Sequence, residues 1–200
     1  MVAVVPEGGL VQDVRGVRRR LLGAIPAAAF AGLVPAARAR AASTRELWVT
    51  RPQAQESVRA VYWCDGAPVP EGIRALEHVF RDVMAGVVHP IDLALLDLNH
   101  ALQRALEAAI GPRPIVLFSG YRTARTSERV GGTRPDIHGE GRADDFILPG
   151  LGFEDNLRLA RMFQVGGLGA YPARGVLHKD VGALRSWIDR RRSPREATAP

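Results

Sequence analysis

Two kinds of hydrophobic spacing occupy different halves of the chain, and this division most constrains its fold. Residues 71–85 carry apolar side chains at helical spacing, and residues 93–110 repeat that spacing behind Asp92, a suitable N-cap. Gly111-Pro112 marks the end of the second helix. Short strand-like runs dominate the rest of the chain. Helices followed by strands predict an α+β fold, here a small antiparallel sheet with flanking helices.

The strand-like runs are short and apolar, and turn residues separate them. The last two are joined by Pro172-Ala173-Arg174, which predicts a hairpin. Other segments are expected to form an extended lead-in at 42–58, a glycine-rich loop at 119–143 and a helix at 153–163. The predicted strands are 60–63, 114–118, 144–148, 166–171 and 175–181.

The first 41 residues have the pattern of an export signal. Arg18-Arg19-Arg20 precedes an apolar run, and Ala39-Arg40-Ala41 supplies an A-x-A cleavage site. The arginines before Leu-Leu resemble a twin-arginine signal, although Val17 stands where Ser or Thr is usual. An amphipathic helix or a retained anchor is the alternative. We therefore expect a signal peptide at 1–41, a periplasmic domain at 42–190 without stable membrane insertion, and a flexible tail at 191–200.

Charge and cysteine content narrow the possible partners and metal sites. The formal net charge is +6, and residues 1–41 contribute +4 of it. The remaining +2 forms no basic stripe interleaved with aromatic residues, so a nucleic-acid partner is not expected. Cys64 is the only cysteine, which excludes an internal disulfide and a cysteine-rich zinc site.

Two of the five histidines lie in a context that suits a metal. His138 ends the glycine-rich loop, and His178 lies in a late strand. Asp144 and Asp145 begin a predicted strand after the loop, and alternation sends them to opposite faces, so that only one of them can join His138 at a metal. Adjacent strands would bring these side chains together, and three protein ligands with one open position are typical of catalytic zinc. A capping histidine and a satisfied strand histidine are the alternative. For His78, His89 and His100 a surface or capping role is expected.

Several motifs in order strengthen the metal interpretation. Ser119-Gly120-Tyr121-Arg122, His138-x-x-Gly141-x-Ala143-x-Asp145 and Val176-Leu177-His178-Lys179-Asp180 resemble the zinc D-Ala-D-Ala peptidases, which share a fold with lysostaphin and the hedgehog signalling domain. The YcbK-like murein endopeptidase branch is the most similar. The resemblance spans residues 45–187 and includes His89-Pro90-Ile91-Asp92 and Arg185-Ser186-Trp187.

The resemblance implies a role for each matched residue. His138, Asp145 and His178 correspond to the zinc ligands, and Arg122, flanked by Tyr121 and Ser119, corresponds to the substrate-binding motif. A guanidinium can grip a carboxylate and offset an oxyanion; a loop arginine paired to a local acid is the alternative. Asp180 is expected to act either as general base or as the partner that orients His178, with Glu140 a further candidate base.

The implied activity is zinc-dependent hydrolysis of amide bonds in peptidoglycan peptide stems or cross-links. The chain departs from the family pattern at Asp136, where Ser is usual, at Glu140, where Gln is common, and at Asp144, where an apolar residue is usual. Relatives also carry a Glu or His shortly before the last ligand, where this chain has Gly175-Val176-Leu177. These departures leave open a catalytically inactive module of the same fold that binds peptidoglycan.

Overall fold

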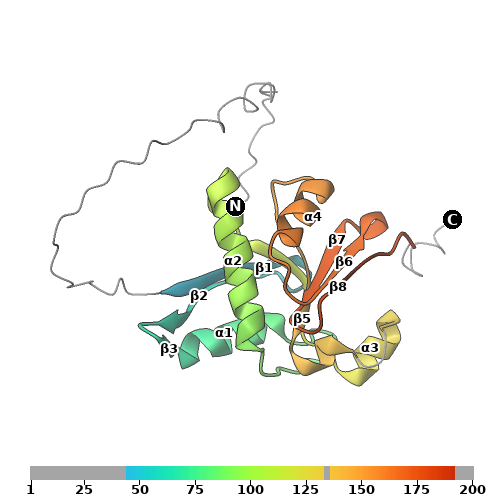
Figure 1. Ribbon diagram of the computed structural model, residues 1–200. Coiled ribbons are helices and arrows are strands. Elements are labelled where there is room, and N and C mark those ends of the chain that lie inside the picture. Colours follow the sequence, from blue (N-terminus) through green and yellow to red (C-terminus); the bar gives the residue numbers. More distant parts are fainter. Residues whose placement is uncertain (1–43, 133–135, 192–200) are drawn as a thin grey trace, which may run out of the picture. The chain divides into compact units, whose positions relative to one another are not determined.

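One eight-stranded sheet organises the computed structural model, which describes residues 44–132 and 136–191 (Figure 1). These residues all belong to a compact unit that begins at Arg40. The expected signal peptide and nearly all of the expected tail lie outside the described residues. Among the described helices none is long and apolar enough to cross a membrane.

The sheet is mixed, and its strand order is β3-β2-β1-β4-β5-β7-β6-β8. β1 pairs with β4 and β6 pairs with β8 in parallel, whereas the other neighbours are antiparallel. The strands are β1 (Arg45–Arg51), β2 (Glu56–Cys64), β3 (Ala67–Pro68), β4 (Ile115–Ser119), β5 (Ala143–Ile147), β6 (Gly167–Tyr171), β7 (Val176–Asp180) and β8 (Arg185–Ile188).

The helices lie between these strands in the chain. The α-helices are α1 (Pro70–Phe80), α2 (Leu93–Ile110), α3 (Ala124–Val130) and α4 (Phe153–Arg161), and short 3-10 helices are η2 (Pro52–Ala54), η3 (Ile137–Glu140) and η4 (Pro172–Arg174). The α+β class is therefore confirmed. The sheet is larger than predicted and contains two parallel pairings.

The helix at 93–110 forms as predicted, whereas the first helix ends earlier than expected. Asp92 caps α2 by accepting a hydrogen bond from the Ala94 amide at 2.9 Å. α1 ends at Phe80 rather than at residue 85. Asp82 explains the early end, because its side chain accepts hydrogen bonds from the Met84 and Ala85 amides and forms a turn in place of the helix.

The predicted extended lead-in at 42–58 is wrong, because most of it belongs to the sheet. β1 and β2 pair as an antiparallel hairpin from Arg51↔Glu56 outward. Leu47 and Val49 are fully buried, whereas Trp48 and Thr50 are only partly buried, which is the period-two burial of a strand. The predicted loop at 119–143 likewise contains α3, which Thr123 caps by accepting a hydrogen bond from the Thr126 amide.

The hydrophobic core lies on the face of the sheet that α1, α2 and α4 cover. The predicted apolar face of α2 is buried there, and Tyr62 of β2 reaches α2, donating a hydrogen bond to Asp97 at 2.8 Å. Phe146 of β5 and Leu177 of β7 face the same core. Strand alternation turns the adjacent residues, Asp145 on β5 and His178 on β7, to the opposite face of the sheet.

A buried ion pair lies within this core. The Lys179 ammonium donates to Asp144 and lies 3.5 Å from the centre of the Phe146 ring. Asp144 also accepts a hydrogen bond from the Asn99 side-chain amide at 2.6 Å. Burial lowers the pKa of Lys179, and the negative charge of Asp144 opposes that shift. Asp144 therefore balances a cation inside the core and contributes no charge to the opposite face.

Replacing Lys179 with methionine is expected to cost about 3–5 kcal/mol in the free energy of unfolding, because it leaves the Asp144 carboxylate buried without a cation. Urea denaturation measures the change. The double variant Asp144→Leu with Lys179→Met should recover most of the loss. Arg59→Met, which breaks an exposed pair with Glu46, is the control and should change stability by about 1 kcal/mol or less. A similar loss of stability in Lys179→Met and in Arg59→Met would contradict the prediction.

Candidate metal centre

Strand pairing and a short helix bring His138, Asp145 and His178 together. Asp145 of β5 and His178 of β7 are direct partners in the antiparallel register. His138 lies in η3, whose N-cap Asp136 accepts a hydrogen bond from the His138 amide at 3.1 Å. Each of the three residues offers one ligand atom, and these atoms all lie within 4.8 Å of one another.

The spacing of the three ligand atoms suits a tetrahedral metal. His138 Nε2 lies 3.1 Å from His178 Nδ1 and 3.5 Å from Asp145 Oδ1, and the last two atoms are 3.1 Å apart. Zinc–ligand bonds of about 2.0–2.1 Å place tetrahedral ligand atoms roughly 3.3 Å from one another. The donor set and its geometry therefore fit zinc with three protein ligands.

The ring nitrogens that face away from the cluster have partners that fix both imidazoles. His138 Nδ1 lies 2.7 Å from the Gly120 carbonyl, and His178 Nε2 lies 3.1 Å from Asp180 Oδ2. A carbonyl and a carboxylate both require an N–H donor at these nitrogens. The opposite nitrogens point at the cluster and are therefore the ones that can bind a metal.

Asp180 is completely buried behind His178. Its carboxylate also accepts hydrogen bonds from the Gly167 amide at 2.9 Å, the Gly182 amide at 2.8 Å and the Arg185 guanidinium at 2.6 Å. Because Asp180 contacts the imidazole nitrogen that faces away from the cluster, its position favours the orienting role over that of a general base.

Arg122 lies beside the ligand set. Its guanidinium donates to the second carboxylate oxygen of Asp145, lies 3.1 Å from His138 Nε2, and donates through Nε to the Ser119 hydroxyl at 2.7 Å. The structure thus places Arg122 at the cluster, and Ser119 holds the arginine. The Tyr121 ring stacks on that of His89, with centres 4.3 Å apart.

Buried charge shapes the protonation of the ligands. Burial disfavours ionised Asp145, but its interactions with His138 and Arg122 outweigh this effect and hold the pKa of Asp145 well below its usual range. Burial lowers the pKa of His178, and hydrogen bonds to Asp145 and Asp180 outweigh that effect and raise it to about 9. The same hydrogen bond from His178 lowers the pKa of Asp180, against the effect of burial.

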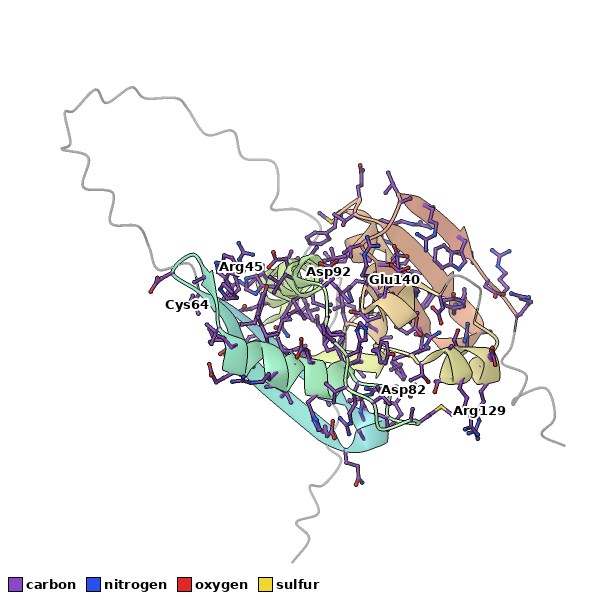
Figure 2. The ribbon with its side chains drawn as sticks, turned by 90° about the horizontal axis from the view of Figure 1, so that it is seen from below. Arg45, Cys64, Asp82, Asp92, Arg129 and Glu140 are labelled. Carbon is purple, nitrogen blue, oxygen red and sulfur yellow. The ribbon has the colours of Figure 1, made fainter. Side chains whose placement is uncertain are left out.

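The three acids that depart from the family pattern occupy different places. Asp144 lies on the face of the sheet opposite the cluster, where it pairs with Lys179. Glu140 pairs with Arg142 at 3.0 Å, and Arg142 also approaches Asp92, which lies beside Glu140 in Figure 2. Asp136 is the acid nearest the cluster, 3.9 Å from Arg122, and it accepts a hydrogen bond from Ser127.

Two further residues, Trp187 and Asp82, support the site. The Trp187 ring centre lies 5.3 Å from that of His178. A side chain at Gly169 would clash with Trp187 at 2.5 Å, so the tryptophan requires a glycine on β6. Asp82 accepts hydrogen bonds from the Thr123 amide and hydroxyl and thereby anchors the segment that carries Arg122.

Replacing Asp180 with asparagine is expected to weaken zinc binding about 10–100-fold, because the partner that orients His178 loses its charge. Competition with a chelator measures the affinity. Asp189→Asn, which alters an exposed pair with Arg191, is the control and should leave the affinity unchanged. A fall in kcat without a loss of zinc affinity would instead assign Asp180 the role of general base.

The mixed sheet carries a His-Asp-His cluster that could hold a metal ion, and three protein ligands are typical of a catalytic metal site. Residues 39–187 match the M15 peptidase family model described as peptidoglycan L,D-endopeptidase MepK. The chain belongs to this family.

Curated relatives agree with this assignment. The chain is 30% identical over 178 residues to the peptidoglycan L,D-endopeptidase MepK of Escherichia coli (strain K12), a match that covers 85% of this chain and 96% of the relative. It is 28% identical over 123 residues to the probable peptidoglycan L,D-endopeptidase MepK of Haemophilus influenzae, which covers 59% and 65% of the two chains. The resemblance seen in the sequence motifs is therefore confirmed over most of the chain.

Proposed function

We propose that this protein is a zinc-dependent peptidoglycan endopeptidase that cleaves an amide bond between an L-configured and a D-configured residue. Family membership supports the reaction and the substrate class. The single observation that carries the metal dependence is the fit of the three ligand atoms, 3.1–3.5 Å apart, to tetrahedral zinc. The L,D preference rests on the description of the relatives.

His138, Asp145 and His178 are proposed to hold the zinc ion, which lowers the pKa of a bound water and polarises a carbonyl oxygen. Gly120 and Asp180 keep both imidazoles in the tautomer that can bind the ion. Arg122, held by Ser119, directs its donors at the same position and is proposed to stabilise negative charge on the substrate. Trp187 forms a wall of the site beside His178.

We further propose that residues 1–41 direct export and that the mature enzyme acts in the periplasm, where its substrate lies. The signal pattern and the peptidoglycan specificity of the relatives support this location. Sequencing the N-terminus of the protein purified from the periplasm tests it. A mature chain that starts at Arg40 or Ala42 is expected, and an uncut N-terminus would contradict the proposal.

The activity is tested by incubating the mature, zinc-loaded protein with purified peptidoglycan and identifying the released fragments by mass spectrometry. We expect new fragments whose ends correspond to cleavage between an L and a D centre. Cleavage of D,D bonds alone would contradict the proposed preference. Binding to peptidoglycan without any release, at full zinc occupancy, would favour the non-catalytic binding module.

A further inference from the structure

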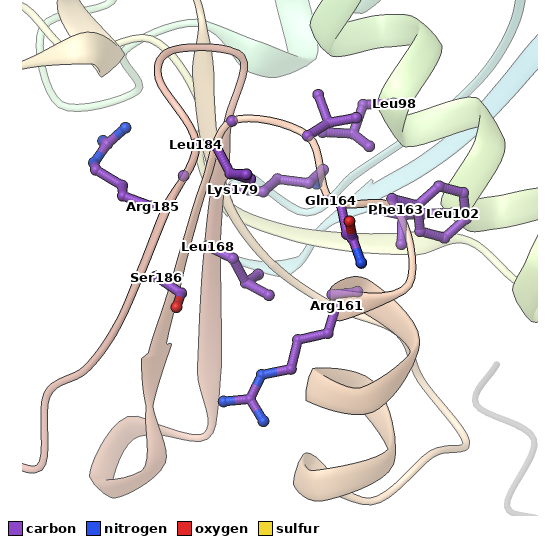
Figure 3. Close-up of a pocket in the computed structure, with 14 residues that line it drawn as sticks. Leu98, Leu102, Arg161, Phe163, Gln164, Leu168, Lys179, Leu184, Arg185 and Ser186 are labelled. Carbon is purple, nitrogen blue, oxygen red and sulfur yellow. The ribbon is translucent and has the colours of Figure 1, made fainter.

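A pocket of about 380 Å³ lies on the face of the sheet opposite the metal cluster (Figure 3). Leu168, Lys179 and Ser186 line it. Their neighbours on the same strands, Gly169, His178 and Trp187, face the cluster, and strand alternation separates the two sets. The pocket is therefore a separate site, which the proposed hydrolysis does not use.

The interior of this pocket is mostly aliphatic. Its volume lies within the range of small-molecule sites, which are apolar with a few polar groups. Leu184, which also lines the pocket, is 72% exposed and extends its apolar surface outward. The apolar lining includes Leu98 and Leu102 of α2, Phe163 and Val165 after α4, Leu168 of β6 and Leu184.

The charge at the pocket is positive. Within the described residues that line it none is acidic, and three are basic. Lys179 is neutralised by Asp144, and Arg185 is neutralised by Asp180. No carboxylate in the described part of the chain pairs with the third, Arg161, which lies at the end of α4 among the residues that line the pocket (Figure 3). Arg161 therefore offers a free guanidinium at the rim.

We propose that this pocket binds a small amphipathic carboxylate, that is, an aliphatic chain ending in one carboxylate group. The aliphatic part of the ligand lies between α2, α4 and β6, and its carboxylate accepts hydrogen bonds from Arg161. The apolar interior favours an aliphatic ligand, because burial of apolar surface is favourable. The guanidinium without a counter-ion favours a carboxylate at one end of that ligand. The limited, partly enclosed volume favours one short chain over a segment of a partner protein.

Octanoate is a suitable probe, and octan-1-ol is its uncharged counterpart. Isothermal titration of the zinc-loaded protein should show saturable octanoate binding. Arg161→Gln should weaken octanoate binding at least about tenfold and leave octanol binding unchanged, because only octanoate makes the charge-assisted hydrogen bond. Arg158→Gln, one turn earlier on the exposed side of α4, is the matched control and should leave both affinities unchanged.

Carboxylates also bind zinc, so two variants locate the octanoate. Ser186→Trp adds bulk at an exposed residue that lines the pocket and should abolish binding, whereas His178→Ala should leave it unchanged. The reverse pattern would place octanoate at the metal and overturn the proposal. Equal effects of Arg161→Gln and Arg158→Gln, or no binding at millimolar octanoate, would also overturn it. Tighter binding of an apolar peptide with amidated ends would assign the pocket to a protein partner instead.

Discussion

His178→Ala is expected to remove the bound zinc and to lower kcat/KM for peptidoglycan fragments by more than about 10³-fold. This loss exceeds the roughly 10–100-fold effect of replacing a residue that only hydrogen-bonds to a metal ligand. His178 is proposed to supply one of the three ligand atoms, and it contacts both His138 and Asp145. Its removal therefore opens the cluster and leaves two ligands. Metal analysis of the purified variant and fragment release measured by mass spectrometry provide the two readouts.

His78→Ala is the matched control for this experiment. His78 lies on α1 with its side chain 59% exposed, and its only ion-pair partner in the described structure is Glu56, 3.8 Å away. Zinc content and activity should stay at the wild-type level. Wild-type zinc content in His178→Ala would contradict the assigned ligand set. Treating the wild-type protein with a chelator should reproduce the loss, and adding zinc back should restore activity only where His178 is present.

Arg122→Ala is expected to lower kcat about 10²–10³-fold while zinc stays bound, because it removes a donor aimed at developing negative charge. Arg122→Lys should recover only part of the loss. A lysine keeps the charge but cannot reproduce the contacts that the guanidinium makes to Ser119 and Asp145 at once. Steady-state kinetics on a purified muropeptide separates kcat from KM.

Arg125→Ala is the control for Arg122, because Arg125 is exposed on α3 three residues further along the chain. Its kinetics should match those of the wild type. If Arg122→Ala loses zinc, the arginine supports the metal ligands and does not act on substrate. If Arg122→Ala keeps both zinc and full activity, Arg122 is only a loop arginine paired with Asp145.

The spacing of apolar and polar residues was sufficient to predict features that lie within one helix or one strand. The helix at 93–110, its cap Asp92 and its buried leucines follow from spacing and from a short polar side chain at the right place. Alternation along β5 also separated Asp144 from Asp145 before the structure was known, and the structure confirms that they face opposite sides. In β1 the apolar Trp48 stands between Leu47 and Val49 and interrupts the alternation of apolar and polar residues, so the same reasoning failed there.

The sequence by itself determined the α+β class, the residues able to bind a metal and, through ordered motifs, the family. Only the tertiary structure decided how those residues act. It paired Asp145 with His178, placed Asp180 behind the ring, and turned Asp144 inward to meet Lys179. These contacts join β5 to β7 across more than thirty positions of sequence. The contacts are determined by the order and register of the strands. Strand order and register depend on the packing of the whole sheet, which no local sequence pattern specifies.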